Sequence, residues 1–589
     1  MRRIILVLTI LLLACRAITL LSPFPPSLTP TVTPSSSPLT PTPPPPTSSP
    51  LPLTPPPPTF TAPPPAGFAV NFHPDGDLYV SDQVSLEVIP PPYTRLDNAS
   101  IQVQVDAPSG ARLGPTKFEP FGIGGRTQAT MLWVWDTRGL EPGSHTLAFT
   151  VQPSGPTWTE TVTLQPESAV PAPEPRAHWA IARSKCCVLN YITGTAAERD
   201  LPSLLTQADE QANDAIQHMG IDFSAPITVT LVPRLLGQGG FANGEITVSY
   251  LDRNYGSSNF TLILHHEMIH TLDGRLGGEL RPTLLQEGLA VYMSGGHYKP
   301  EQQLPRAAAL LDTSNGGLGW YLPLIPLTDN FYISQHEIGY IEASVLVEYM
   351  VDTWGWQAFS AFYRDIHPQS NGSQAQAIDV ALKKHFGLPY AELEQKFLEA
   401  LHHQTITNQT RDDVRLTVYY FDTLRRYQQA LDPSAYFQNA WLMDNKQMRQ
   451  RGIVADYLRH PSAPDSLALE TLLISAWGDL NAGSYSEAQL TLAAVNAVLD
   501  ELNQGIPNPF TIDPLAADYD AIVQVLGSHV YQAQRIEVQG DTALAWVSRT
   551  SPELIELKLS RVNGEWKLDG YARIMTVQVC WEVEVARAA

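Results

Sequence analysis

Two histidines and a glutamate stand close together in the stretch LHHEMIHTLDG, residues 264–274. His266 and His270 are four positions apart, so on a helix their side chains project from one face, and Glu267 stands next to that face. Two imidazoles placed in this way can bind one zinc ion, while the carboxylate beside them can take a proton from water. The spacing therefore predicts a zinc site that is equipped for hydrolysis.

A third ligand is needed, because zinc hydrolases take three ligands from the protein and leave a fourth position for water. Glu287 is the candidate, since it lies in the apolar run TLLQEGLAVYM, residues 283–293, where a carboxylate needs a partner. A metal ion is one such partner, and an ion pair with Arg275 or Arg281 is the alternative.

The cysteines do not form a ligand set of their own. Besides Cys15 near the N-terminus there are only the adjacent Cys186 and Cys187 and the distant Cys580, so no Cys-x-x-Cys spacing exists. The adjacent pair could be two small buried hydrophobic residues, one of them bonded to Cys580. Any metal ion must therefore be held by histidine and carboxylate side chains.

The helices that would position these residues have recognisable ends. Ser258 or Asn259 can cap the helix that carries the histidines, and Gly274 can end it. Thr283 can cap the helix that carries Glu287, and Gly295 can end that helix. Two consecutive helices are thus expected to bring the ligands together.

The motifs HHEMIH and LLQEGLAVYM, in this order, resemble those of the gluzincins, the zinc metallopeptidases whose third ligand is a glutamate on a second helix. The strongest resemblance is to the bacterial peptidase MA-like group, and it extends over residues 176–405. It implies a mostly helical α+β domain with Zn²⁺ as the cofactor. By this resemblance His266, His270 and Glu287 are the metal ligands, and Glu267 is the general base.

A tyrosine is expected to assist these residues. In SQHEIGYIEASVLVEYM, Ser334 and Glu337 have the spacing of a capping box, and Tyr340 falls in the early turns of the helix that follows. In many relatives a tyrosine at a similar point donates a hydrogen bond to the oxyanion of the tetrahedral intermediate, which assigns that role to Tyr340. A packed core tyrosine is the alternative, and Tyr332 and Tyr292 are rivals for the role.

Other polar residues near the motif have supporting parts in this interpretation. Gln286 and Asp273 could each accept the N–H of a ligand imidazole and hold its tautomer. His265 points off the zinc face, and His297 either touches substrate or is a loop histidine. The strand EITVSYL, residues 245–251, could pair its backbone with an extended peptide, which favours a peptide over other amides.

The N-terminal residues predict an export signal. Residues 1–15 hold two arginines, an apolar run and a cysteine, which is similar to a bacterial lipoprotein signal with Cys15 lipidated. An uncleaved anchor that runs to Leu21 is the alternative. Residues 16–66 predict an extended stalk, because residues 22–66 are rich in Pro, Ser and Thr, and in an extended conformation they reach on the order of 140 Å. Both interpretations put the remaining chain outside the cell, attached to the bacterial cell membrane.

The remainder of the chain predicts a multidomain protein. Residues 67–175 contain short alternating runs, and WDTRGLEPGSHTLAFTV resembles the end of an immunoglobulin-like β-sandwich. Residues 176–405 form the gluzincin-like domain, and residues 406–589 predict a helical accessory domain that ends in antiparallel strands, with a hairpin turn at Asn563-Gly564. Helices before a curved sheet suggest a fold of the nuclear-transport-factor-like type for this last part.

The formal net charge of −22 argues against nucleic acid as a partner, because phosphate binding needs clustered Lys and Arg. The expected protein is a cell-surface zinc metallopeptidase whose partners are a peptide or protein substrate and, through the lipid, the membrane. Two alternatives stay open. One is a surface binding or adhesion protein that keeps the peptidase fold without turnover, and the other is a zinc hydrolase of a cell-wall amide.

Overall fold

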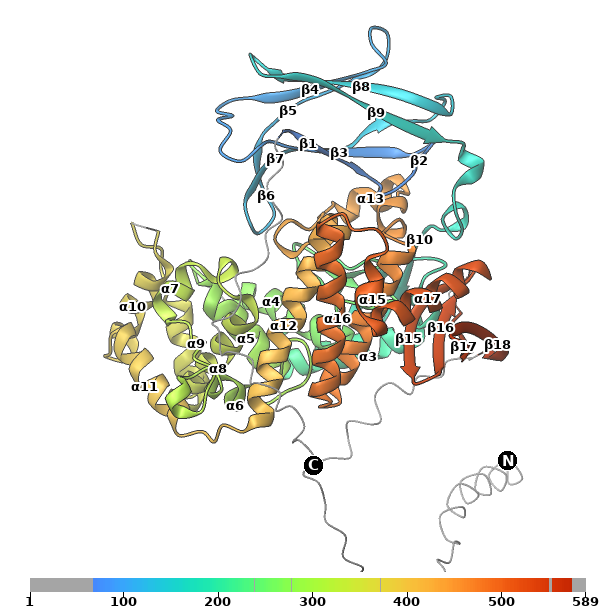
Figure 1. The fold of residues 1–589 in the computed structure, drawn as a ribbon. Coiled ribbons are helices and arrows are strands. Elements are labelled where there is room, and N and C mark those ends of the chain that lie inside the picture. The colour runs from blue at the N-terminus through green and yellow to red at the C-terminus, as the bar shows by residue number, and fades with distance from the viewer. Residues whose placement is uncertain (1–66, 238, 277, 371, 550–552, 575–589) are drawn as a thin grey trace, which may run out of the picture. The chain divides into compact units, whose positions relative to one another are not determined.

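The computed structural model describes residues 67–574, apart from 238, 277, 371 and 550–552 (Figure 1). The predicted signal with Cys15, the predicted stalk and Cys580 lie outside the described residues. Among the residues that are described, no helix combines the length and the apolar character needed to cross a membrane.

The N-terminal part consists of two β-sheets that share one core. The strands of the first sheet are, in spatial order, β1 (Ala69–His73), β3 (Gln83–Ile89), β7 (Arg126–Asp136) and β6 (Glu119–Phe121). Those of the second are β2 (Leu78–Tyr79), β9 (Thr157–Gln165), β8 (Gly143–Gln152), β4 (Ser100–Val105) and β5 (Arg112–Lys117). Strand β7 of the first sheet and strands β4 and β8 of the second bury alternate residues, so both sheets turn an apolar face to the shared core.

The middle part is mostly helical and is built on a five-stranded sheet. Its strand order is β10 (Trp179–Arg183), β11 (Cys187–Ile192), β12 (Ile227–Val232), β14 (Ile246–Ser249) and β13 (Gly240–Ala242). Strands β11, β12 and β14 are parallel, and helix α3 (Leu201–Met219) connects β11 to β12. Strand β13 pairs antiparallel with β14 and is the last strand at its edge.

Helices α4 (Phe260–Leu276), α5 (Thr283–Ser294) and α8 (His336–Trp354) carry the predicted site residues. The other helices of the middle part are α2 (Ala196–Arg199), α6 (Gln303–Ala308), α7 (Leu324–Asp329), α9 (Trp356–Arg364), α10 (Gln374–His385) and α11 (Tyr390–His402). Apolar residues of the sheet and of these helices form one continuous core.

The C-terminal part continues with helices and ends in an antiparallel sheet. Its helices are α12 (Asn408–Leu431), α13 (Asn445–Arg451), α14 (Ala455–Leu458), α15 (Pro464–Asn481), α16 (Tyr485–Asn503) and α17 (Pro514–Ser528). The sheet has the order β15 (Gln532–Gln539), β16 (Thr542–Ser548), β17 (Ile555–Val562) and β18 (Glu565–Ile574). Asn563 and Gly564, both with positive φ, form the predicted hairpin turn between β17 and β18.

Helix α12 belongs to two cores at once. Its residues Val414 and Val418 pack in the core of the middle part, whereas Tyr420 and Phe421 pack in that of the C-terminal part. Helix α12 therefore couples the core of the middle part to that of the C-terminal part. The predicted boundary near residue 405 falls just before this shared helix.

The helix ends differ in part from the predictions. Asn259 caps α4, because its Oδ1 accepts a hydrogen bond from the Leu262 N–H, but the helix continues past Gly274 to Leu276. The prediction that Gly274 ends the helix is wrong, since this glycine does not adopt the left-handed conformation that ends a helix. Gly295 at the end of α5 does adopt it, with φ +74°.

Two predicted N-caps are also wrong. Thr283 is the first residue of α5 itself and Pro282 precedes it, so the Thr283 N–H is satisfied by Oε1 of Gln374 from another helix. At α8 the cap is Gln335, whose Oε1 accepts from the Ile338 N–H. The Glu337 carboxylate is engaged elsewhere, in a buried ion pair, and cannot complete a capping box.

The two bonded cysteines also differ from expectation. Cys186 and Cys187 form a disulfide with each other, at the entry to β11. The sequence alone leaves open that both are small buried hydrophobic residues and that one of them is bonded to Cys580. That interpretation is wrong, because the two cysteines are bonded to each other.

Gly288 allows α5 and α8 to approach closely, which yields a prediction about stability. A Cβ at this position would lie 2.3 Å from the backbone oxygen of Ala343, so the Gly288→Ala change must push the helices apart. We expect a loss of about 1–3 kcal/mol in the free energy of unfolding, measured by denaturant titration. Gly274→Ala is the control, because its Cβ would meet only Arg281 Nη1 at 3.5 Å. Equal stability of the two variants would contradict the argument.

Candidate metal centre

The residues of the motif come together at one point between α4 and α5. Nε2 of His266 and Nε2 of His270 lie 2.9 Å apart, and each lies 3.2 Å from Oε2 of Glu287. The two imidazole planes are almost perpendicular, at 86°. The structure thus places three possible ligand atoms, from two helices, around one small space, and they form a group that could hold a metal ion.

These distances match the requirements of a tetrahedral metal site. Ligand bonds of about 2.0–2.1 Å in tetrahedral geometry put neighbouring ligand atoms roughly 3.3 Å apart. The observed separations of 2.9–3.2 Å are within a few tenths of an ångström of that value. Two imidazoles and one carboxylate are also a chemical set that zinc accepts. The donor set therefore fits a divalent ion such as zinc after shifts of a few tenths of an ångström.

The alternative partner for Glu287 is not observed. Arg281 pairs with Asp273 instead, at 3.1 Å, and no ion pair joins Arg275 to Glu287 among the described residues. The carboxylate is nevertheless buried, with 5% of its residue surface exposed. Its nearest neighbours across the small space are the two histidines, and when these are neutral a cation in that space would balance its charge.

The pKa values of Glu287 and His270 show how strongly the carboxylate and the histidines of the ligand group interact. Burial alone would raise the pKa of Glu287, but His270 and His266 outweigh it and hold that pKa well below its usual range. In turn burial lowers the pKa of His270, but Glu287, Glu267 and Asp273 together outweigh burial and raise that pKa to about 9. A proton shared within this group is what a metal ion would replace, since the ligating imidazoles must be neutral.

Glu267 lines the same cleft but is not part of the ligand group. It is buried, and burial raises its pKa, an effect that His270 and His266 partly offset. Strand β13 runs directly against it: a Cβ on Gly240 would come 3.4 Å from Oε1 of Glu267. No hydrogen bond ties the carboxylate to another described side chain, so it is free to accept a proton.

Of the three tyrosines considered, two reach the site. The Tyr332 hydroxyl donates a hydrogen bond to Oε1 of Glu287, the oxygen that faces away from the histidines. Tyr340 lines the cleft with its ring centroid 6.3 Å from that of His266, and burial and the nearby Glu287 raise its pKa well above normal. Tyr292 is not among the residues that line the cleft. Both remaining phenols stay protonated at neutral pH and can donate hydrogen bonds.

His297 belongs to the site and is more than a loop histidine. Its ring stacks on Tyr340, with centroids 3.8 Å apart and planes at 8°, and it lines the cleft. Burial holds the pKa of His297 well below its usual value, so the ring is neutral. His336 packs against the same tyrosine in an edge-to-face arrangement, with ring centroids 4.5 Å apart and planes at 64°. The two histidines fix the orientation of the Tyr340 ring.

The predicted supporting hydrogen bonds are not formed. Asp273 binds Arg281 and the Tyr363 hydroxyl through Oδ2, while its Oδ1 and Nδ1 of His270 are buried without partners among the described residues. Gln286 lines the cleft and makes no hydrogen bond to either ligand histidine. The expectation that Asp273 or Gln286 accepts the imidazole N–H is therefore wrong for this arrangement.

The cleft also contains residues that the sequence interpretation missed. It has a volume of about 610 Å³, and its walls include Phe437, Ala440 and Leu442 from the C-terminal part and Gly122 and Ile123 from the hairpin between β6 and β7. The hairpin is joined to the C-terminal part by a hydrogen bond from the Gly124 N–H to the Gln438 oxygen. No motif marks these residues, because they reach the site only through long-range packing.

The strand expected to face substrate is also a different one. The predicted segment contains β14, which is hydrogen-bonded on both sides by β12 and β13 and has no free edge. The free edge belongs to β13, residues Gly240–Ala242, next to Glu267. The short segment GFA, residues 240–242, which precedes the predicted strand, thus supplies the edge.

Comparison with known proteins adds no relative: the sequence matches no protein-family model, and the search of curated proteins found no match. The geometry of the chain itself therefore carries the functional argument.

The ligand geometry predicts that three side chains are needed to hold the metal ion. We expect His266→Ala, His270→Ala and Glu287→Ala each to lower zinc affinity by at least about tenfold, because a three-ligand set loses one member. Zinc content after dialysis against a weak chelator is the measurement. His529→Ala, which removes an exposed histidine in the C-terminal part, is the control. Full zinc affinity in the Glu287 variant would remove Glu287 from the ligand set.

Proposed function

We propose that this protein is a zinc-dependent peptidase of the gluzincin type, anchored by a lipidated N-terminus outside a bacterial cell. The observation that carries the proposal is the convergence of the three ligand atoms beside the unpaired carboxylate of Glu267. The proposal takes the two-sheet N-terminal part as an immunoglobulin-like spacer. It takes the middle part as the peptidase domain and the C-terminal part as the accessory domain.

The ligands have distinct tasks in the proposed reaction. His266, His270 and Glu287 would hold the zinc ion, which when bound polarises a carbonyl group and makes water a stronger acid. Tyr332 occupies Oε1 of Glu287 and so directs Oε2 towards the histidines. This hydrogen bond orients the carboxylate as a ligand.

In the proposed reaction Glu267 carries out the proton transfers. Its carboxylate takes a proton from the attacking water and returns it to the leaving amine. The buried setting, which raises the pKa of Glu267, brings it nearer the range in which it can do both. Tyr340, whose ring contacts those of His297 and His336, would donate a hydrogen bond to the oxygen on which negative charge develops.

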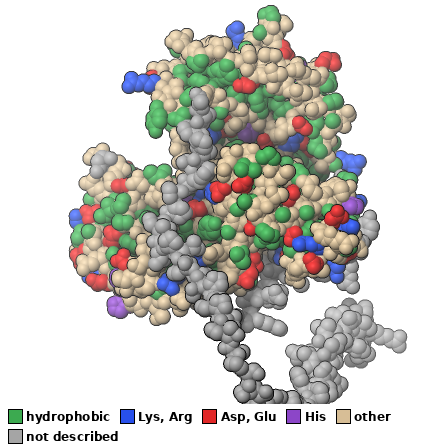
Figure 2. All heavy atoms as spheres, in the orientation of Figure 1, with side chains coloured by type: hydrophobic (Ala, Val, Ile, Leu, Met, Phe, Trp, Pro, Cys, Tyr) green, Lys and Arg blue, Asp and Glu red, His purple; other side chains and the backbone are tan. Residues whose placement is uncertain are grey.

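The edge of β13 favours a peptide as the substrate. Its outer backbone groups have no strand partner among the described residues, and the strand passes beside Glu267. An extended peptide can add to such an edge, which would lay its backbone across the general base. On the face drawn in Figure 2, acidic and basic side chains are interspersed without a patch of one sign, which fits a peptide better than a nucleic acid.

Replacement of the general base separates an enzyme from a binding protein. Glu267→Gln removes the proton acceptor but no metal ligand, so it should keep its zinc and lower peptide hydrolysis by about a thousandfold or more. The measurements are zinc content and cleavage of a broad peptide library, with the exposed Glu279→Gln as the control. A wild-type protein that holds zinc and cleaves no peptide would instead support the binding-protein or cell-wall-amide alternatives.

The two tyrosines should respond differently to loss of the hydroxyl. Tyr340→Phe should lower kcat about a hundredfold with little change in zinc content or KM, because its hydrogen bond acts mainly in the transition state. Tyr332→Phe should mainly weaken zinc binding, because its partner is the ligand Glu287. Tyr292→Phe, outside the cleft, is the control. Near-normal kcat in Tyr340→Phe, together with a large loss in Tyr332→Phe at full zinc content, would move the oxyanion role to Tyr332.

A further inference from the structure

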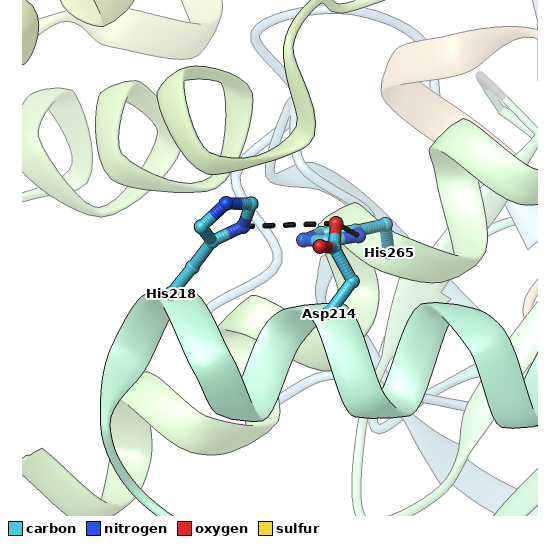
Figure 3. Close-up of side chains that lie close together, drawn as sticks. All are labelled: Asp214, His218 and His265. Atoms are coloured by element: carbon cyan, nitrogen blue, oxygen red, sulfur yellow. Dashed lines mark ion pairs between the residues drawn. The ribbon is translucent and has the colours of Figure 1, made fainter.

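A second group of possible metal ligands lies where α3 packs against α4. It consists of Asp214 and His218 from α3 and His265 from α4, and one ligand atom from each residue lies within 4.8 Å of the others (Figure 3). None of the three lines the cleft that contains Glu267. The group is thus separate from the proposed catalytic centre, although His265 is the direct neighbour of His266.

Helix periodicity places these residues together. Asp214 and His218 are four positions apart and share one face of α3, while the buried alanines 208, 212 and 215 of the same helix pack inwards. Successive residues of a helix point about 100° apart, so His265 leaves α4 on a different side from His266. Figure 3 shows the His265 ring reaching towards α3, with the Asp214 carboxylate against it and the His218 ring beyond.

The environment of His265 distinguishes this group from an ordinary surface ion pair. The residue is 2% exposed, and its Nε2 is buried with no hydrogen-bond partner among the residues described. Its Nδ1 faces Oε1 of Gln211 at 3.0 Å. When Nδ1–H donates to Gln211, the lone pair of Nε2 is left free, and a buried nitrogen without a partner is costly. A bound cation removes that cost.

The other two side chains are loosely held and can adjust. Oδ2 of Asp214 lies 3.4 Å from Nδ1 of His265 and 3.6 Å from Nδ1 of His218, which is too long for good hydrogen bonds. The side chains of Asp214 and His218 are each 49% exposed, so rotation of these two side chains can bring their ligand atoms towards the free Nε2 of His265, at the separation of roughly 3.3 Å that tetrahedral ligands need. Their exposure also gives an ion and a water ligand access from solvent.

We propose that Asp214, His218 and His265 bind a second divalent metal ion of the zinc class. Two imidazoles and one carboxylate suit zinc, with water as the fourth ligand. Gln211 orients the buried imidazole, as hydrogen-bond partners of ligating histidines do elsewhere. The ion ties α3 to the helix that carries the proposed catalytic ligands. Its role is structural, because the group contains no second carboxylate among the described residues that could act as a base.

The test is zinc stoichiometry in the full-length protein, by equilibrium dialysis in the presence of a weak chelator. We expect about two zinc ions per chain in the wild type and about one in His218→Ala and in Asp214→Asn. The loss should remove part of the rise in melting temperature that zinc produces, because an ion bound only by the folded state stabilises it. His529→Ala is again the control and should keep both ions.

The catalytic-site variants separate this proposal from the proposed function. Glu287→Ala should keep about one ion, held by the second group, and the Glu287→Ala/His218→Ala double variant should keep almost none. A wild type with about one ion that is lost in Glu287→Ala and kept in His218→Ala would overturn the second site alone. One ion that is kept in Glu287→Ala and lost in His218→Ala would support the second site and overturn the catalytic one.

Discussion

The burial of two carboxylates, Glu267 and Glu287, constrains the whole middle part of the protein. Both belong to helices whose buried residues are mostly apolar, and a buried charge without compensation costs several kcal/mol. Glu287 is compensated by two histidines and a tyrosine hydroxyl, whereas Glu267 has only the field of those histidines. A divalent cation in the ligand group would stabilise both charges at once. A bound metal ion would therefore account for the burial of these carboxylates, whereas packing of the core alone would not.

The surrounding packing keeps these charges in place. Gly288 lets α5 lie against α8, and that contact sets the distance between Glu287 and Tyr340. Helix α8 is also held by Arg425 of α12, which pairs with the buried Glu337 in the first turn of α8. The N-terminal turn of α8 is thus fixed by a residue outside the predicted peptidase domain. The orientation of Tyr340 depends on that ion pair, because Tyr340 lies one turn further along the same helix.

Buried ion pairs also connect other regions that are distant in sequence. Arg459 contacts Asp82 of the N-terminal part, and Arg234 contacts Asp432, both at hydrogen-bond distance. Replacing one member of such a pair leaves an uncompensated charge, so each pair specifies one arrangement of its partners more strongly than an apolar contact does. The C-terminal part consequently shares in the folding of the site and is more than an appendage.

The sequence allowed the site to be predicted where local periodicity determines geometry. The four-residue spacing of His266 and His270 and the apolar surroundings of Glu287 were sufficient to identify the residues that the structure brings together. The alternating runs likewise predicted sheets in the N-terminal region and a C-terminal sheet. The helix caps were predicted less well, because Glu337 serves an ion pair and Thr283 is bonded to Gln374. Such competition between partners is decided by tertiary contacts.

The walls of the cleft could not be predicted for the same reason, and they bear on what the site can accept. On the proposed function, a peptide added to the edge of β13 meets side chains from three separate regions: Ile123, Phe241 and Phe437. These are apolar, so burial of an apolar substrate side chain against them would strengthen binding by about 25 cal/mol for each Å² removed from water. On this proposal, metal ligation and proton transfer would be encoded in two short motifs, while selection among peptides would depend on residues that lie far from them in sequence. A chain with the same motifs but a different N-terminal hairpin would then keep the proposed chemistry and change its preferred substrates.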